Sequence, residues 1–386
     1  MTDRARLIRE YISEHQTDFL SLLQSLVEVE TPSDEPETFS MIWEILSEQF
    51  ESLNYTTKHF ESDETAGQLL CKPDDFDPSK PAQLVLGHCD TVWDVGTLNE
   101  MPFSIEDDRV AGPGVYDMKS GIAMMTFGIQ TIHSLDKTPK VQPIFLINSD
   151  EEIGSHESKE RILEQAKLAE RTFVLEPSLG NDGKIKTRRK GVGDFEVTIN
   201  GNPSHAGLAP EEGVSAILGL SHIVQQLFRL NDPGNGVTVN VGTIEGGERS
   251  NVVAAKSKAV VDVRVPTKED GDRIKEQIYN LQPEIDGIKL SVSGDINRPP
   301  LEKNESNNKL WKTAKKLGKE LDLDLQEGMS GGASDGNFSN LHSPTIDGLG
   351  AVGEGAHAYH EKIFLEQTLD RLALLTLLLL EPPLFD

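Results

Sequence analysis

The sequence predicts an α/β protein with a mostly parallel central sheet, into which a smaller α+β unit is inserted. Apolar runs typical of buried strands, at residues 68–71, 83–86 and 142–148, alternate with helical segments in the first part of the chain. From about residue 188 the apolar residues alternate with polar ones instead, and after residue 298 the first pattern returns. A chain of 386 residues is also too long for a single core of ordinary size.

The elements of the larger part follow in order. Apolar residues recur at helical spacing from Leu7 to Leu26, which predicts helix over the opening thirty or so residues. A predicted helix at 118–135 separates the strands at 83–86 and 142–148. Because strand, helix, strand is the order that joins parallel neighbours, we expect helices to cover both faces of the sheet.

The inserted part has the order β-α-β-β-α-β, which is typical of a ferredoxin-like α+β sandwich. Its elements are predicted at residues 193–200, 213–230, 237–244, 252–265, 268–281 and 288–292. The predicted domains are residues 1–187 and 299–386 for the larger part and 188–298 for the insertion. The apolar stretch Leu372–Leu380 is shorter than the ~20 residues of a membrane span, so we expect a buried helix there.

Composition excludes some partners. The net charge of −27 argues against nucleic acid and anionic membranes, because such a surface repels polyanions. Only Cys71 and Cys89 are present, and the polar N-terminus has no apolar signal core. We therefore expect a cytoplasmic protein without a disulfide framework.

Side chains able to bind a metal lie after apolar strands or in glycine-rich loops. In open α/β sheets the carboxyl ends of strands form the sites, and imidazole with carboxylate ligands suits Zn²⁺ with an exchangeable position. Each cluster also has a simpler interpretation, such as a surface histidine, a helix-capping aspartate or a solvated acidic turn. Their joint occurrence favours a metal site. The clusters contain His88 and Asp90; Asp117; Glu151 and Glu152; Glu176; and His357 and His360.

Seven motifs together resemble the M20 metallopeptidase family, and within it the glutamate carboxypeptidase (carboxypeptidase G2-like) group. They run in family order between residues 84 and 361: GHCDT, GVYDMKSG, DEEIGS, LEPS, NPSHAG, SGGASDGN and GAHAYHE. The resemblance implies a zinc-exopeptidase-like catalytic domain. It also implies that the inserted unit is a lid that forms a homodimer contact.

The resemblance further implies two Zn²⁺ ions, with Co²⁺ or Mn²⁺ as alternatives. Asp117 stands at the position of the aspartate that bridges both ions, and the peptide bond after it is often cis in this family. His88 and Glu176 would complete the ligands of one ion. Glu152 and His357 would complete those of the other.

Two further positions match acids of the family's mechanism. Glu151 matches the general base that takes a proton from the attacking water, and Asp90 matches the acid behind the ligand His88. For the last ligand we prefer His357 to His360, because Glu361 follows His357 by four residues as in the family.

The substrate contacts are implied by the same resemblance. His205 matches a histidine that reaches across the dimer to the substrate carbonyl, where it would stabilise the oxyanion. Asn251, Arg264 and Arg298 match residues that receive the substrate's backbone and its C-terminal carboxylate. Gly332 lies in a glycine loop whose backbone amides could hold an anion. From the residues alone, His205 would be interpreted as a loop histidine, and Arg264 and Arg298 as arginines that end strands and contribute only to solubility.

The expected function is hydrolysis of an amide bond that releases a C-terminal amino acid from a small peptide or an acylated amino acid. An N-acyl-amino-acid deacylase, an acetylornithine deacetylase or a dipeptidase of the same family is the nearest alternative. An alternative of another class is a non-catalytic binding or scaffold protein that keeps the fold.

Overall fold

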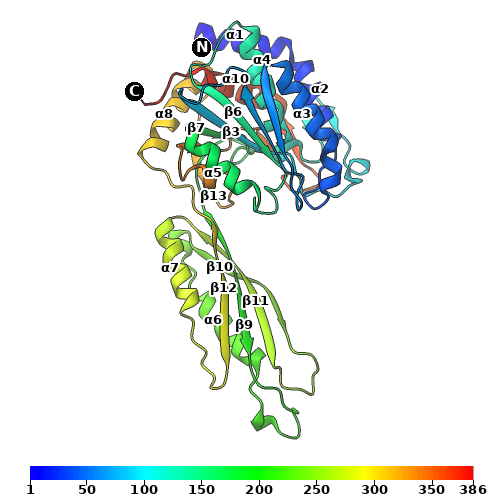
Figure 1. The fold of residues 1–386 in the computed structure, drawn as a ribbon, viewed down its shortest axis with the longest axis vertical. Coiled ribbons are helices and arrows are strands. Elements are labelled where there is room, and N and C mark those ends of the chain that lie inside the picture. The colour runs from blue at the N-terminus through cyan, green and yellow to red at the C-terminus, as the bar shows by residue number, and fades with distance from the viewer. Residues whose placement is uncertain (386) are drawn as a thin grey trace. The chain divides into compact units, whose positions relative to one another are not determined.

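The computed structural model describes residues 1–385, which form two compact units (Figure 1). Unit 1 comprises Met1–Arg188, Lys303–Ser330 and the chain from Ser334 onward, and unit 2 comprises Arg189–Glu302 with Gly331–Ala333. Unit 2 extends beyond the predicted insertion because contacts of Arg189 join its first residues to two later segments of the chain. Arg189 forms an antiparallel bridge with Leu301, and its guanidinium donates to the carbonyls of Gly332 and Ala333.

Unit 1 is built on a six-stranded sheet of order β1-β2-β6-β3-β7-β14. The strands β6, β3, β7 and β14 are mutually parallel, whereas β1 and β2 form an antiparallel edge. The prediction of a mostly parallel sheet is confirmed, and the antiparallel edge was not foreseen. The strands are β1 (Tyr55–Phe60), β2 (Gln68–Pro73), β3 (Ala82–His88), β6 (Gln142–Asn148), β7 (Ala169–Val174) and β14 (Thr345–Ile346).

Helices cover both faces of this sheet (Figure 1). Val85 and Phe145 point into one core with α1 (Asp3–Glu14), α2 (Gln16–Val27), α3 (Ser40–Ser52), α4 (Ser120–Ser134), α8 (Glu305–Glu320) and α10 (Leu365–Leu380). Leu84 and Leu146 point to the opposite face, where α5 (Ser158–Leu168) and α9 (Gly336–Ser339) pack. Burial on both faces explains why these strands are apolar throughout.

Smaller elements complete unit 1. A four-stranded sheet has the order β15-β16-β5-β4, and β13 pairs with β8. The short strands are β4 (Ser104–Glu106), β5 (Arg109–Ala111), β8 (Ile185–Arg189), β13 (Glu327–Ser330), β15 (Gly353–Glu354) and β16 (Lys362–Phe364). The short helical turns are η1 (Pro36–Phe39), η2 (Thr97–Asn99) and η3 (Val115–Lys119), with η4 (Pro210–Glu212) and η5 (Pro233–Asn235) in unit 2.

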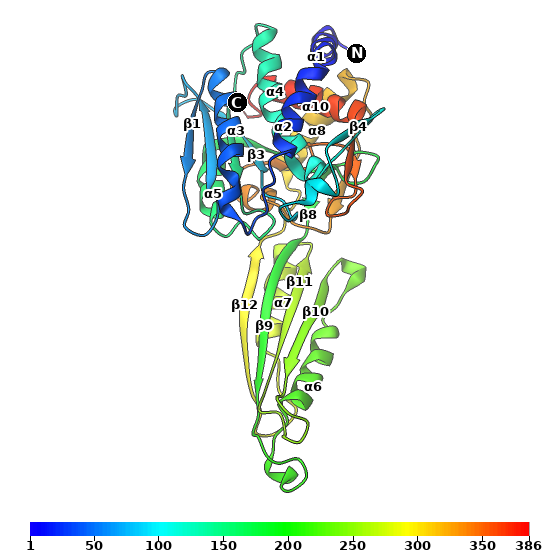
Figure 2. The ribbon, with the colours of Figure 1, turned by 90° about the vertical axis from the view of Figure 1, so that its right-hand side faces the viewer.

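Unit 2 is an antiparallel sheet of order β10-β11-β9-β12 with helices on one face (Figure 2). Along β9 Phe195 and Val197 are buried in the core with the helices, whereas Asp194 is exposed on the opposite face. The observed order is the predicted β-α-β-β-α-β. Its elements are β9 (Gly191–Asn200), α6 (Ala216–Phe228), β10 (Thr238–Gly246), β11 (Lys256–Val265), α7 (Lys268–Tyr279) and β12 (Lys289–Arg298).

Two features differ from the predictions. The strand expected from residue 252 begins at Lys256, because the carbonyls of Ala254 and Ala255 accept hydrogen bonds from outside the sheet, from the amides of Ala216 and Gly201. The N-terminal helical region is divided at His15. The predicted C-terminal helix is confirmed as a buried helix, α10. None of the helices described over residues 1–385 is long and apolar enough to cross a membrane.

Candidate active site

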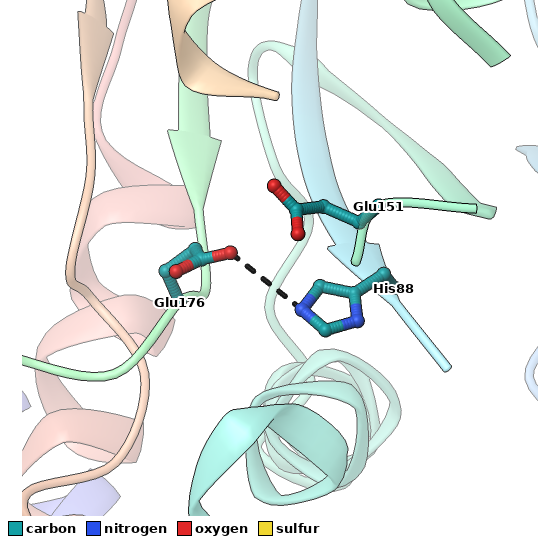
Figure 3. A group of neighbouring side chains, drawn as sticks. All are labelled: His88, Glu151 and Glu176. Atoms are coloured by element: carbon teal, nitrogen blue, oxygen red, sulfur yellow. Dashed lines mark ion pairs between the residues drawn. The ribbon is translucent and has the colours of Figure 1, made fainter. Parts of the chain in front are cut away.

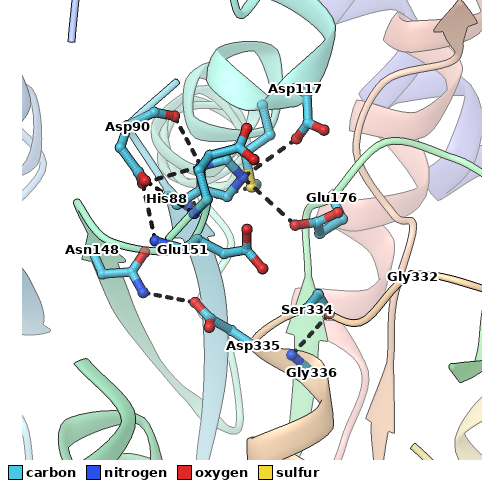
Figure 4. Close-up of polar contacts among 12 residues, drawn as sticks. His88, Asp90, Asp117, Asn148, Glu151, Glu176, Gly332, Ser334, Asp335 and Gly336 are labelled. Carbon is cyan, nitrogen blue, oxygen red and sulfur yellow. Dashed lines mark hydrogen bonds and ion pairs between the residues drawn. The ribbon is translucent and has the colours of Figure 1, made fainter. Parts of the chain in front are cut away.

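Three parallel strands bring acidic and imidazole side chains to one edge of the central sheet (Figure 4). His88 ends β3 and Asp90 follows it, Glu151 and Glu152 come shortly after β6, and Glu176 comes after β7. Because these strands are parallel neighbours, their carboxyl ends meet at the same edge. Five residues from three separate segments of the chain are thereby gathered by the topology alone.

Asp117 reaches the same place from the turn η3. Its backbone is non-helical (φ −114°, ψ 96°), and α4 begins only at Ser120 without a side-chain cap. The simple interpretation of Asp117 as a helix cap is therefore wrong. The Asp117–Met118 peptide bond is cis, as the family resemblance implies.

The distances place Asp117 between two histidines. His88 Nε2 lies 3.3 Å from Asp117 Oδ1, and His357 Nε2 lies 3.6 Å from Asp117 Oδ2. On the outer sides, His88 Nε2 is 3.6 Å from Glu176 Oε1, and His357 Nε2 is 3.2 Å from Glu152 Oε1 (Figure 3 shows the first pair). The two carboxylate oxygens of Asp117 thus face different imidazoles. Each imidazole also contacts a second carboxylate, that of Glu176 for His88 and that of Glu152 for His357.

These donor atoms fit divalent cations. His88 Nε2 and Asp117 Oδ1 are buried and make no hydrogen bond within residues 1–385, although they are neighbours. Buried polar atoms normally have a partner, so a pair without one marks a place for a ligand. Ligand atoms of His88, Asp117 and Glu152, and likewise those of His88, Glu151 and Glu176, lie within 4.8 Å of one another. Imidazole nitrogen and carboxylate oxygen are ligands that Zn²⁺, Co²⁺ and Mn²⁺ accept.

The cluster's electrostatics also favour cations. The carboxylates of Asp117 and Glu152 raise the pKa of His357 to about 10, against the opposing effect of burial. Burial lowers the pKa of His88, but the carboxylates of Asp117, Asp90 and Glu176 outweigh burial and hold this pKa well above its usual range. Burial raises the pKa of Asp117, but His357 and His88 bring it below its ordinary value. Negative charge is therefore in excess, which a divalent ion compensates.

Asp90 holds His88 and the acidic turn together. Its Oδ1 lies 3.3 Å from His88 Nδ1 and accepts a hydrogen bond from the Glu151 amide at 3.3 Å. Its Oδ2 accepts from the Glu152 amide at 3.1 Å and from Ser33 Oγ at 2.9 Å. A carboxylate in this position fixes the ring so that Nε2 is the free ligand atom.

Glu361 is a residue whose role the sequence prediction missed, although its spacing from His357 was noticed. One of its oxygens accepts from the backbone amides of Tyr116 (2.9 Å) and Asp117 (3.0 Å). The other accepts from the Gly114 amide (3.0 Å) and from Trp93 Nε1 (2.8 Å). Burial raises the Glu361 pKa to about 7, against these hydrogen bonds. Glu361 therefore positions the turn that carries Asp117.

Two neighbouring residues lie outside the cluster. Asp150, the first acid of the acidic turn, accepts hydrogen bonds from the amides of Glu157 and Ser158 at the start of α5. His360, the alternative to His357, is exposed and lies near Glu354. Of the two histidines, His357 is the one with ion-pair contacts to Asp117 and Glu152 within the described chain.

The predicted substrate contacts belong to unit 2. His205 Nδ1 accepts hydrogen bonds from the amides of Gly207 (3.1 Å) and Leu208 (3.2 Å). Because Nδ1 is an acceptor, Nε2 carries the proton in the neutral ring and is available as a donor. The Asn251 carbonyl accepts from the amide next to His205, that of Ala206, so the two loops adjoin.

The two predicted arginines share one row of the unit 2 sheet. Arg264 in β11 and Arg298 in β12 are both in register with Val192 of the strand between them, so they point to the same face. Arg264 donates to both oxygens of Asp262 at 2.8–3.0 Å. Arg298 is largely buried. The Gly332 carbonyl accepts from Arg189, in unit 2 as well.

The fold and the site define the class of protein: an α/β enzyme whose cluster of histidines and carboxylates, at the carboxyl ends of parallel strands, could hold metal ions. The family model for peptidase family M20/M25/M40 matches residues 84–381. The chain therefore belongs to this family and is a metallopeptidase or amidohydrolase.

Individual relatives differ in the reaction that their names describe. The chain is 28% identical to carboxypeptidase G2 of Pseudomonas sp. (strain RS-16) over 92% of this chain and 86% of that protein. It is 25% identical to succinyl-diaminopimelate desuccinylase 2 of Shewanella loihica, over 83% of this chain and 89% of that protein. Among solved structures it is similar in fold to aminopeptidase PepT of Bacillus cereus, with a TM-score of 0.76, 23% identity and coverage of 94% and 98%.

Proposed function

We propose that this enzyme uses two zinc ions to hydrolyse an amide bond and release a C-terminal amino acid from a small peptide or acylated amino acid. The observation that supports this most is the position of Asp117, whose two carboxylate oxygens face His88 and His357 separately. A carboxylate between two imidazoles suits a bridging ligand better than a single-ion ligand.

The proposed ligands divide into two sets that share Asp117. His88 and Glu176 would hold one ion, and Glu152 and His357 the other, with Co²⁺ or Mn²⁺ as possible replacements for Zn²⁺. Bound ions of this kind supply activation of water and polarisation of the amide carbonyl. Asp90 would orient His88, and Glu361 would hold the Asp117 turn in place.

Glu151 is proposed as the general base. Its carboxylate lies close enough to His88 and Glu176 to be a ligand itself, so distance alone does not separate the two roles. The family motif assigns the first glutamate of the pair to proton transfer and the second to the metal. Glu151 would accept the proton of the attacking water and return it to the leaving amine.

The substrate is proposed to be fixed by unit 2. Arg264 and Arg298 lie in one row and would bind the C-terminal carboxylate, with Asn251 and Gly332 on the substrate backbone. Arg264 already donates to Asp262, so the substrate would share or replace this pairing. His205, with its proton on Nε2, would donate to the developing oxyanion.

A homodimer through the lid is part of the proposal. Four large apolar residues of unit 2, on α6 and on the edge strand β10, are each 49–59% exposed: Ile217, Leu218, Phe228 and Ile244. Exposed apolar residues beside an unpaired strand edge are typical of an association surface. Association there would let His205 of one protomer serve the site of its partner, as the resemblance implies.

One other reaction has support from the comparisons. The desuccinylase relative acts on an N-succinyl compound by its name, so removal of an acyl group from an amino acid is the second candidate. A screen of γ- and α-linked glutamyl amides, N-acetyl and N-succinyl amino acids and dipeptides, made on protein of measured metal content, tests both. Release of a C-terminal amino acid as the best reaction supports the first proposal, and a preference for N-succinyl substrates supports the second. Metal-loaded protein that hydrolyses nothing would favour a scaffold.

A further inference from the structure

Arg371 lines a cavity that the proposed reaction does not use. It lies in α10 and is only 4% exposed, and its Nη1 is buried without a hydrogen-bond partner among residues 1–385. The cavity has a volume of about 280 Å³ and lies within unit 1, between α10, the turn at residues 181–183 and the segment Leu323–Leu325. A guanidinium has five N–H donors, so a buried one without an acceptor is unusual.

The neighbouring turn is shaped to admit the guanidinium. Gly183 has a positive φ of 65°, and a Cβ at this position would lie 3.0 Å from Arg371 Nη2. A larger residue would therefore press on the arginine. Burial lowers the pKa of Arg371 to about 10, so the side chain still carries its charge at neutral pH.

The carboxylates that line the cavity do not neutralise Arg371. Asp370 is bound by Arg9, Asp182 is bound by Lys184 at 2.7 Å, and Asp324 accepts a hydrogen bond from Gln326 Nε2 at 2.9 Å. Asp370 acts on Arg371 through space, without an ion pair at contact distance. A buried charge without a partner at contact distance is costly in free energy, and a bound counterion lowers that cost.

We propose that the cavity beside Arg371 binds a small monovalent anion, of the size and charge of chloride. The arginine supplies the charge and the N–H donors, and the cavity has ample room for such an ion. A polyanion is disfavoured, because Asp182, Asp324 and Asp370 line the same cavity and would repel a second negative charge.

The first test compares thermal unfolding of the metal-loaded full chain in chloride and in gluconate at equal ionic strength. We expect a saturable rise of the unfolding midpoint by about 2–5 °C in chloride. The variant Arg371→Gln should lose this rise, whereas Arg6→Gln, which alters an exposed arginine of α1, should keep it. An equal rise in Arg371→Gln would overturn the proposal and would locate the chloride effect elsewhere, for example at the metal centre.

The second test needs no variant and decides the matter if Arg371→Gln fails to fold. Crystals of the unaltered protein grown or soaked in bromide should give an anomalous peak in contact with the Arg371 guanidinium. Only water beside Arg371, with bromide bound elsewhere or nowhere, would refute the site.

Discussion

At the scale of single residues, the arrangement around Asp117 determines what the site can do. The aspartate has an imidazole on each carboxylate oxygen and a buried backbone amide that donates to Glu361 at 3.0 Å. His88 is in turn held by Asp90, and the turn that carries Asp117 is held by Glu361. A metal centre needs such fixed outer contacts, because they set the direction of each ligand atom.

The neighbouring glutamates Glu151 and Glu152 should give opposite phenotypes. Glu151→Gln is expected to keep both metal ions and the fold but to lower kcat by about 10²–10⁴-fold, because the proton acceptor is removed. Glu152→Gln is expected to lose metal, because it removes the proposed ligand beside His357. Metal analysis and kinetics on the two variants check this. Full activity in Glu151→Gln would exclude it as the base.

Metal affinity should depend on pH. A histidine ligand must be neutral, and the acids around His357 raise its pKa to about 10, so binding near neutral pH must displace a proton. Affinity is therefore expected to rise with pH, roughly tenfold per unit for each proton displaced, and to fall on acidification. Competition with a coloured chelator measures it. His360→Ala should keep the slope, and an affinity that is flat from about pH 6 to 8 would contradict the assignment.

Part of the site was predictable from residues alone. His88, Glu151, Glu152 and Glu176 follow apolar strands, and the general rule for parallel sheets predicts that such residues meet. His357 does not follow a parallel strand, so its approach to Asp117 came only from the family motif. The hydrogen bonds of Glu361 to the Asp117 turn have no local sequence signal, because they join segments about 240 residues apart.

At the scale of elements, strand length decided what the sequence could predict. Strands buried on both faces, such as β3 and β6, have long apolar runs and were predicted. The strands β5 and β16 have three residues each, too few to show a period of two. The antiparallel direction of β2 was not predicted, because periodicity reports burial but not the direction of pairing.

Helix α7 offers a test of local stability in unit 2. Thr267 Oγ1 accepts a hydrogen bond from the Asp270 amide at 3.1 Å and donates to the Asp270 carboxylate at 2.6 Å. Thr267→Ala should lower the free energy of unfolding of this unit by about 1 kcal/mol, and Thr267→Ser should restore most of it. Hydrogen exchange of the α7 amides measures the effect. Unchanged exchange in the alanine variant would show that the cap does not stabilise the helix.

At the scale of the whole molecule, family membership and the two units together limit the function. The match to peptidase family M20/M25/M40 begins in β3 and ends after α10, so it includes both units. The relatives named above carry out different reactions on the evidence of their names. The family match alone therefore does not determine the substrate, and unit 2 holds the arginines proposed to select it.

The proposed dimer can be tested through the edge strand β10. Ile244→Lys places a charge on the exposed edge and should give a monomer by light scattering, with low activity if His205 acts across the dimer. In the unaltered interface, mixing His205→Ala with Glu151→Ala protomers should recover part of the activity. A dimer that persists in Ile244→Lys would place the association elsewhere, and an absence of recovery would confine His205 to its own subunit.

Anomalous diffraction at the zinc edge, from crystals of the metal-loaded protein, tests the central claim most directly. Two peaks should flank the Asp117 carboxylate, one in contact with His88 and Glu176 and the other with Glu152 and His357. A map with no peak beside Asp117, or with Asp117 in contact with no ion, would contradict the account.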